Sequence, residues 1–243
     1  MTTTQSDPGG SRPQGSHAAG SRPEHLPPWS SALVVVAHPD DESFGLGAII
    51  HQLTSNGTDV NILCYTHGEA STLNETGADL RSARQEELRQ ATAALGAVGF
   101  TLLEYPDGGL AGIGAGELAR HVAGMAQRHR PEGLLVFDDT GITGHPDHQA
   151  ATQAAVDYGL AAGLPVLAWA LPAVVADQLS QETGAHFAGQ QPDQIDMCVR
   201  VDREVQRRAA LLHATQVSPT AVLWRRLQLL GDCEHLRWLR PLG

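Results

Sequence analysis

Short apolar runs that alternate with longer helical segments are the feature that most constrains how this chain can fold. The apolar runs are too short for buried helices and read as strands, at residues 33–37, 60–65, 100–104, 133–137, 165–171 and 197–201. Between them, residues 79–95 and 116–130 place apolar side chains at helical spacing. Strands that alternate with helices predict an α/β fold with a mostly parallel, doubly wound sheet.

Composition separates the start of the chain from the rest. Residues 1–30 consist mainly of Gly, Ser, Pro, Thr, Gln and Arg, which predicts a disordered tail. Residues 31–243 are long enough to form a single domain with a substantial core. No apolar run approaches the ~20 residues that span a bilayer, and no basic and then apolar leader opens the chain. We therefore expect a soluble cytoplasmic protein with no membrane partner, whose oligomeric state stays open.

Charge and residue types exclude several functions. The net charge of −11 argues against a nucleic acid or an anionic membrane as partner. All 16 positive residues are Arg, which excludes Schiff-base catalysis, pyridoxal phosphate and the P-loop, because each needs a lysine. The three cysteines, Cys64, Cys198 and Cys233, stand far apart and indicate neither a disulfide framework nor a thiolate zinc site. The 12 His and 27 acidic residues remain as a large stock of potential metal ligands.

Acidic residues and histidines follow the first and fourth predicted strands. In open α/β sheets, ligands bind beyond the carboxyl ends of the strands, where the strand order reverses, and this is usually between the first and fourth strands. His-Pro-Asp-Asp-Glu at residues 38–42 follows the first run, and Gly-His-Pro-Asp-His at residues 144–148 comes shortly after the fourth. These carboxylates would repel the pyrophosphate that a dinucleotide fold binds at this point. We therefore expect a cation there.

His38, Asp41 and His148 are the residues that we predict to bind this cation. Two imidazoles and one carboxylate make a three-ligand site with open positions, which is typical of a catalytic metal. Taken singly, Asp40, Asp41 and Asp147 could instead cap the helices that follow, since Asp is a favoured N-cap. Two His-Pro-Asp turns at one crevice favour the metal site over separate caps.

The two motifs resemble those of the LmbE-like, or PIG-L, family of zinc-dependent N-acetylglucosaminyl deacetylases, which includes the mycothiol-pathway deacetylase and amidase. Supporting matches at residues 66–69, 84–88, 107–110 and 213–216 extend the resemblance over roughly residues 33–217. The resemblance implies a Rossmann-like sheet and a metal-dependent amidohydrolase. Its expected reaction removes an N-acyl group, with acetyl foremost, from a small molecule that contains an aminosugar.

The resemblance also implies roles for the first motif and its partner histidine. Zn²⁺ would be bound by His38, Asp41 and His148, with Fe²⁺ as a possible native metal. Asp40 would act as the general base, because a free carboxylate beside a liganding one can take a proton from water as it attacks an amide carbonyl.

Further residues of the pocket are assigned by the same resemblance. His145 would stabilise the oxyanion, oriented by Asp107. On the substrate side, Arg84 would contact sugar hydroxyls and Asp147 would orient a ligand histidine. Glu69 is placed in the pocket by analogy, with a solvated loop acid as the alternative.

Two departures and two alternatives keep the function open. The mycothiol branch carries Tyr and Ser where this chain has Thr143 and Gly45, so the exact substrate does not follow from the resemblance. The same three ligands could hold iron(II) in an oxygenase. The chain could also be a metal-dependent binding protein without turnover, although Asp40 and His145 are not needed merely to hold a metal.

Overall fold

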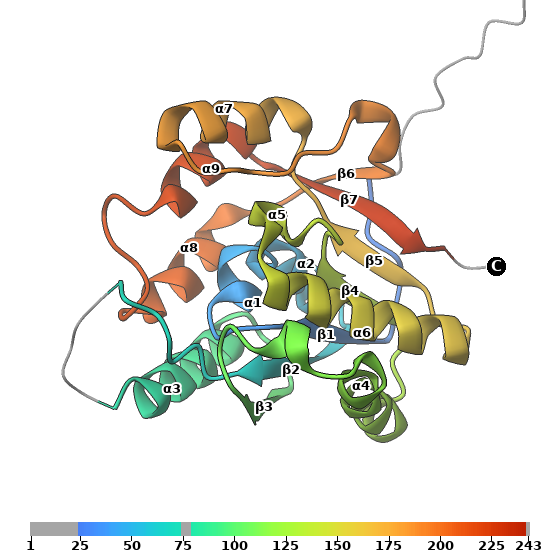
Figure 1. The fold of residues 1–243 in the computed structure, drawn as a ribbon. Coiled ribbons are helices and arrows are strands. Elements are labelled where there is room, and N and C mark those ends of the chain that lie inside the picture. The colour runs from blue at the N-terminus through green and yellow to red at the C-terminus, as the bar shows by residue number, and fades with distance from the viewer. Residues whose placement is uncertain (1–23, 74–78, 242–243) are drawn as a thin grey trace, which may run out of the picture.

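A seven-stranded sheet runs through the part of the chain that the computed structural model describes, residues 24–73 and 79–241 (Figure 1). Its strand order is β3-β2-β1-β4-β5-β7-β6. Strands β1 to β5 pair in parallel, whereas β7 is antiparallel to both β5 and β6. The strands are β1 (Ser31–Val36), β2 (Asp59–Thr66), β3 (Gly99–Tyr105), β4 (Gly133–Phe137), β5 (Val166–Trp169), β6 (Met197–Arg200) and β7 (Cys233–Arg240).

Helices cover both faces of this sheet, as Figure 1 shows for α4 and α6 on the near face. Helices α2, α3, α7 and α8 supply apolar side chains to the core on the other face. The helices are α1 (Asp41–Phe44), α2 (Gly47–Ser55), α3 (Leu80–Ala94), α4 (Ala115–His129), α5 (Gly141–Gly144), α6 (Pro146–Ala162), α7 (Ala173–Thr183), α8 (Arg203–Leu212) and α9 (Val222–Leu230). Short 3-10 turns lie at Leu110–Gly112 and Pro192–Gln194.

Strand β1 shows why the apolar runs of the sequence are nearly continuous. Successive side chains of a strand point to opposite faces, and β1 is covered by helices on both. Val34 and Val36 accordingly belong to the core beneath α2 and α3, whereas Leu33 and Val35 pack with α4 and α6. Both sets must be apolar, which produces the run that predicted the strand.

The predicted α/β class and the predicted strands and helices are confirmed. Strands β1 to β6 coincide with the six predicted runs, and α3 and α4 coincide with the two predicted helices. Strand β7 was not predicted, because charged residues interrupt its sequence. The structure places β7 between β5 and β6.

The packed part of the chain begins before the predicted domain boundary at residue 31. Leu26 and Trp29 are buried, and the Trp29 ring lies so close to the backbone of Gly133 that a Cβ there would meet it at 2.0 Å. These two residues pack with the domain although they precede residue 31. Residues 1–23 of the predicted tail lie outside the described residues.

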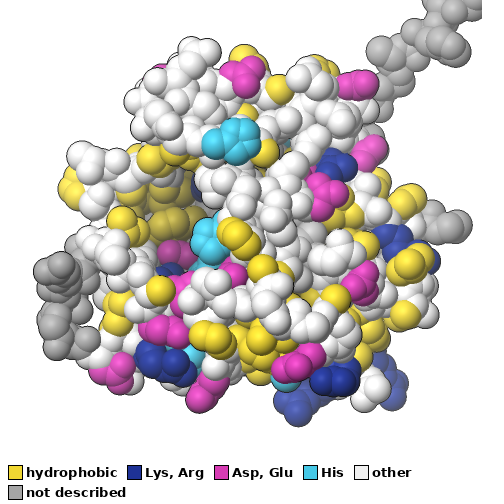
Figure 2. Space-filling view, viewed as in Figure 1, with side chains coloured by type: hydrophobic (Ala, Val, Ile, Leu, Met, Phe, Trp, Pro, Cys, Tyr) yellow, Lys and Arg dark blue, Asp and Glu magenta, His cyan; other side chains and the backbone are white. Residues whose placement is uncertain are grey.

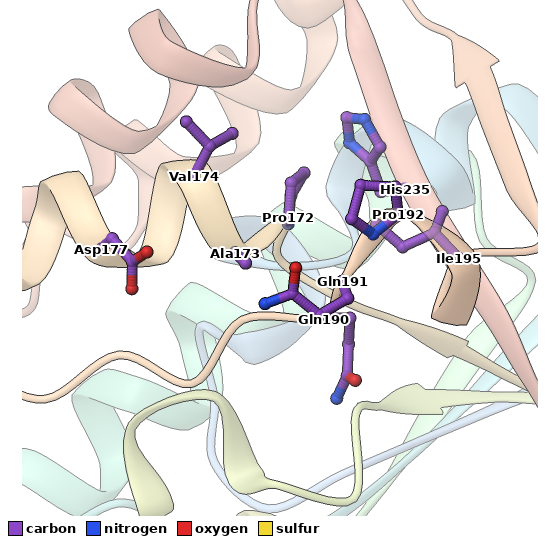
Figure 3. A pocket seen from close by; sticks show the side chains of 9 residues that line it. All are labelled: Pro172, Ala173, Val174, Asp177, Gln190, Gln191, Pro192, Ile195 and His235. Carbon is purple, nitrogen blue, oxygen red and sulfur yellow. The ribbon is translucent and has the colours of Figure 1, made fainter.

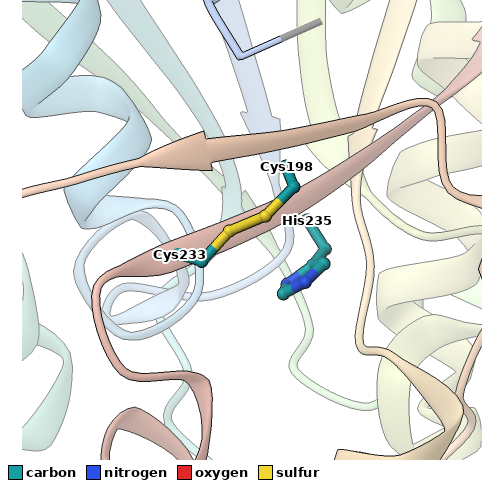
Figure 4. Close-up of side chains that lie close together, drawn as sticks. All are labelled: Cys198, Cys233 and His235. Atoms are coloured by element: carbon teal, nitrogen blue, oxygen red, sulfur yellow. A yellow bond between two sulfur atoms is a disulfide. The ribbon is translucent and has the colours of Figure 1, made fainter. Parts of the chain in front are cut away.

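A disulfide joins Cys198 on β6 to Cys233 on β7, with the Cα atoms 6.1 Å apart (Figure 4). The spacing of the cysteines did not predict this bond, because the antiparallel pairing of the missed strand β7 is what brings them together. Although His235 lies beside the bond, the joined sulfurs are not thiolates that could bind a metal with it. Cys64 is free and buried. Among the described helices, none has the length and hydropathy needed to cross a bilayer.

Candidate active site

The strand order reverses between β1 and β4, which lie side by side in the sheet. This is the crevice at which the sequence predicted a site, and the segments that follow the two strands meet there. Histidine and acidic side chains gather beside a hollow on this face, as Figure 2 shows. The cavity measures about 450 Å³, and it is lined by His38, Asp40, Asp41, Ala70, Ser71, Leu73, Arg84, Asp107, Gly108, His145, His148 and Gln216.

The three predicted metal ligands converge at the base of this cavity. Nδ1 of His38 lies 3.3 Å from Nε2 of His148, and the same Nε2 lies 3.2 Å from Oδ1 of Asp41. Three such donor atoms within 4.8 Å of one another can bind one ion. Two imidazole nitrogens and a carboxylate oxygen suit zinc and also iron(II), so the donor set fits the implied metal without identifying it.

The outer nitrogens of the two histidines contact oxygen atoms that hold the rings in place. Nδ1 of His148 donates to the carbonyl of Gly141 at 3.2 Å, which leaves Nε2 free to bind an ion. Nε2 of His38 lies 3.1 Å from Asp107 and 3.4 Å from Asp147. Oxygen partners behind ligand histidines are typical of metal sites, where they fix the ring and raise its basicity.

The ligand carboxylate is held by the backbone of its own turn. Oδ2 of Asp41 accepts hydrogen bonds from the amides of Ala37 at 3.1 Å and His38 at 2.9 Å, while Oδ1 faces His148. Burial raises the pKa of Asp41, but the charge and hydrogen bonds of His148 and His38 outweigh burial and hold it well below its ordinary value. The carboxylate of Asp41, a predicted ligand, therefore stays ionised.

His38 lies in a strongly negative environment. Burial lowers its pKa, but the carboxylates of Asp107, Asp147 and Asp41 outweigh burial and raise the pKa to about 12. A proton thus balances the surrounding carboxylates where a metal ion would otherwise do so, and the site is built to hold positive charge.

Asp40 faces the cavity beside the ligands and has an unusual backbone. Its φ of 120° and ψ of −27° lie in a region that non-glycine residues rarely occupy. Its Oδ2 accepts a hydrogen bond from Arg84 at 3.0 Å. Burial, reinforced by the neighbouring charge of Asp41 and opposed by Arg84, raises the pKa of Asp40 to about 6. A carboxylate with this pKa is suited to proton transfer near neutral pH.

His145 also lines the cavity, in a defined tautomer. Its Nδ1 accepts a hydrogen bond from the amide of Asp147 at 3.2 Å and so caps α6, which leaves Nε2 as the protonated nitrogen. Burial, and then the positive charges of His148 and His38, lower the pKa of His145. A neutral ring with a free Nε2–H is a donor that can stabilise an oxyanion.

Asp107 and Asp147 both lie close to His38. Asp107 was expected to orient His145, but its carboxylate contacts His38. Asp147 is fully buried and accepts hydrogen bonds from the amides of Gly108 at 2.8 Å and Leu110 at 3.0 Å, so it does not line the cavity. Both acids therefore contact the predicted ligand His38, and an orienting role for Asp147 stays a prediction.

Arg84 and Glu69 are bound to the protein itself. Arg84 is only 3% exposed, and its guanidinium donates to the carbonyls of Gly68 and Pro39 as well as to Asp40. Glu69 accepts a hydrogen bond from the amide of Asp107 at 3.2 Å and is absent from the cavity lining among the described residues. Contacts of these two side chains with a sugar remain predictions.

The structure adds polar residues that the sequence left unassigned. Ser71 donates a hydrogen bond of 2.7 Å to Gln216 across the cavity rim. Glu42 and His213 form a fully buried pair at 2.6 Å directly behind Asp40. Both residues fall within the matched motifs, at residues 38–42 and 213–216, but the sequence assigned neither a role.

The structure contains further cavities besides the one at the site. One of about 500 Å³ shares Leu73 and Gln216 with the catalytic cavity and is otherwise mainly apolar, with Phe44, Phe187 and Leu223 in its wall. Another, of about 440 Å³, lies between the start of α7 and residues 190–195 (Figure 3). No predicted site residue lines this second cavity among the described residues.

Comparison with known proteins agrees with this geometry. The sequence profile of the PIG-L family, described as GlcNAc-PI de-N-acetylase, matches residues 33–158, just over half of the chain. The chain belongs to the PIG-L family. The matched segment contains the two motifs and all three predicted ligands, and PIG-L deacetylases depend on a metal. Membership favours hydrolytic deacetylation over the oxygenase and the binding protein without turnover.

A curated relative of this PIG-L protein matches part of the chain. The 1D-myo-inositol 2-acetamido-2-deoxy-alpha-D-glucopyranoside deacetylase of Tsukamurella paurometabola is 32% identical over 175 residues, which cover 57% of this chain and 59% of that protein. The chain thus spans somewhat more than half the length of this curated relative.

Solved structures confirm the fold. N,N'-diacetylchitobiose deacetylase from Pyrococcus horikoshii aligns with a TM-score of 0.65 at 20% identity, covering 87% of this chain and 84% of that one. The 4-carboxy-2-hydroxymuconate hydratase from Pseudomonas putida KT2440 aligns with a TM-score of 0.63, also at 20% identity, covering 87% and 97%. Because one of these structures is a deacetylase and the other a hydratase, the reaction must be argued from the site.

Proposed function

We propose that this protein is a zinc-dependent amidohydrolase that removes an acetyl group from the amino nitrogen of an aminosugar-containing small molecule. The observation that carries the proposal is the convergence of His38, Asp41 and His148 beside two groups that such a metal site does not need for binding. These groups are the free carboxylate of Asp40 and the protonated Nε2 of His145, and both residues line the same cavity. Relatives that are named as deacetylases of GlcNAc-containing molecules support the choice of substrate.

His38, Asp41 and His148 would hold the zinc ion. When bound, the ion would supply Lewis acidity, which makes water more acidic and polarises the acyl carbonyl. The metal alone does not complete the reaction, because a proton must leave the attacking water and negative charge must be accommodated on the carbonyl oxygen.

Asp40 and His145 would perform these two tasks. With a pKa of about 6, Asp40 is largely ionised at neutral pH and can accept the proton of the water that attacks the amide carbon. Nε2–H of His145 donates to the developing oxyanion, since its Nδ1 is engaged by the amide of Asp147. Asp40 then carries the proton that the departing amine needs. Arg84 holds the carboxylate of Asp40 toward the cavity throughout.

The cavities suggest how the rest of the substrate is accommodated. The catalytic cavity of about 450 Å³ is lined mainly by polar side chains and suits a sugar. Its apolar neighbour, reached past Leu73 and Gln216, would receive the group attached to the sugar. We therefore favour an aminosugar that carries a further, partly apolar substituent over a free monosaccharide.

The test is an assay of acetate release from a panel of N-acetylated aminosugars, with and without attached groups, by protein loaded with zinc or with iron(II). The proposal predicts release of acetate and a free amine from at least one glycoside, dependent on the metal. Addition of water to an enol acid such as 4-carboxy-2-hydroxymuconate, without amide hydrolysis on the panel, would overturn it. The two metal-loaded forms identify the metal that supports turnover.

A further inference from the structure

The backbone of Asp40 is held in a strained conformation by groups that do not face the cavity. Asp40 is one of three non-glycine residues with positive φ in the described part of the chain. Such a conformation is unfavourable for a non-glycine residue and persists only when the surroundings determine it. The proposed base must therefore be held from behind as well as by Arg84.

Glu42 supplies that hold. One carboxylate oxygen of Glu42 accepts the backbone N–H of Asp40 at 3.0 Å. The other oxygen faces Nε2 of His213 at 2.6 Å and accepts from the hydroxyl of Ser43 at 2.5 Å. Glu42 has no exposed surface, so its carboxylate acts within the protein and not on the substrate.

His213 in turn holds Glu42. It is also fully buried, and it lies 171 residues away in the sequence, immediately after α8. Its ring packs edge-on against Phe44 at 6.0 Å between centroids, and its Nδ1 has no hydrogen-bond partner among the described residues. Nε2 is thus the nitrogen that engages polar partners, and these are Glu42 and, at 3.4 Å, Ser43.

Stability alone does not account for this arrangement. A buried ion pair contributes little compared with apolar residues of similar size, and an unpaired ring nitrogen adds a cost. Glu42 also adds a third carboxylate directly after Asp40 and Asp41. The pair does provide a fixed hydrogen-bond acceptor for the backbone N–H of Asp40.

We propose that Glu42 and His213 are positioning residues that hold Asp40 in its strained conformation for proton transfer. The inference rests on the proposed function, in which Asp40 is the base. The pair acts through the Asp40 backbone, whereas Arg84 acts on the Asp40 side chain.

The decisive variant replaces both partners by apolar residues, Glu42→Met with His213→Leu. Such a replacement of a buried pair is often neutral or stabilising, so the protein should fold and bind metal as the wild type does. Its kcat for deacetylation should fall by about 10²-fold, the loss expected when a catalytic group is misplaced by about 1 Å, while KM stays unchanged. His213→Gln, which keeps a donor near the position of Nε2, should retain more activity than His213→Leu.

A matched control is Glu234→Gln, which alters another fully buried carboxylate that contacts Trp169 and Arg203 and lies outside the catalytic cavity. It should lower the melting temperature and leave kcat close to the wild-type value. Wild-type kcat in the folded double variant would overturn the inference and leave the proposed function standing. A wild-type protein without any deacetylation would overturn the proposed function. In that case, a crystal structure of the double variant still tests the inference, which predicts that the φ angle of Asp40 leaves its positive value and is overturned if it does not.

Discussion

Two buried clusters in this molecule each pair an arginine with a carboxylate, but they differ in what they do. The β7 cluster consists of Arg203, Glu234, Trp169 and Gln206, and the catalytic cluster consists of His38, Asp40, Asp41, Glu42, Arg84, Asp107, His145, Asp147, His148 and His213. In the β7 cluster, Glu234 accepts hydrogen bonds from both Trp169 and Arg203. The remaining N–H groups of Arg203 reach backbone carbonyls and Gln206.

The catalytic cluster is not closed in this way. Three consecutive carboxylates, Asp40, Asp41 and Glu42, crowd together, and the backbone of Asp40 is strained. Nitrogens and oxygens from several of its residues line a cavity. Burial of charge is common to both clusters, so it does not mark function here. Excess negative charge, backbone strain and an open cavity distinguish the catalytic cluster.

Removing the metal should have the largest effect. We expect a strong chelator to abolish deacetylation, because the predicted ligands His38, Asp41 and His148 would hold the ion that activates water and polarises the acyl carbonyl. His148→Ala should give the same loss and should lower the amount of bound metal. Activity assays alongside metal analysis measure both effects. Full turnover by metal-free protein would show that the catalytic cluster does not act through a metal.

Replacing the oxyanion donor should have the next largest effect. His145→Ala removes the Nε2–H that faces the cavity, and kcat should fall by about 10²–10³-fold, the range found for loss of one such donor. Metal content should be unchanged, because His145 is not among the converging ligands. A large fall in bound metal with little change in kcat per metal ion would instead make His145 a ligand.

The β7 cluster should affect stability and not catalysis. Glu234→Ala leaves Arg203 buried without its carboxylate, and it should lower the free energy of unfolding by about 3–5 kcal/mol. Denaturant unfolding measures this change, and kcat of the folded fraction should stay near the wild-type value. A selective loss of kcat without destabilisation would show that the two clusters are coupled.

A smaller effect is expected from the pH dependence of stability at Asp138, which pairs with Arg237 beside β5 and β7. Burial raises the pKa of Asp138, but hydrogen bonds from Arg237 and Thr140 outweigh burial and hold it below the ordinary value of 3.8. The stabilisation is therefore present above pH 3.8 and is lost as the pH falls through the lower pKa of the folded state. Asp138→Asn should cost stability at pH 7 and progressively less below pH 3.8, as thermal unfolding at a series of pH values would show.

The sequence predicted the contacts that follow from a general rule of the fold. It did not predict the contacts that no local pattern indicates. The convergence of His38, Asp41 and His148 was predictable because each follows a strand, and the rule for strand-order reversal brings such segments together. The role of His213 was not predictable, because its partner Glu42 lies 171 residues away and no local pattern links them. Strand β7 was missed for a related reason, since its position depends on antiparallel pairing with strands that are distant in sequence.

The direction of individual side chains was the second feature that the sequence did not predict. The resemblance suggested that Asp107 would orient His145, but the structure turns Asp107 toward His38. Sequence spacing identifies which residues reach the crevice, whereas the choice of partner within it is made by differences of an ångström or so in side-chain placement.

The central claim is that Asp40 acts as the base beside a metal held by other residues. The most direct test measures bound metal and acetate release for the wild type and for Asp40→Asn. We predict that the variant keeps the wild-type amount of metal and loses at least about 10²-fold in kcat, in line with the contribution of general base catalysis. Wild-type acetate release by metal-loaded Asp40→Asn would contradict the account.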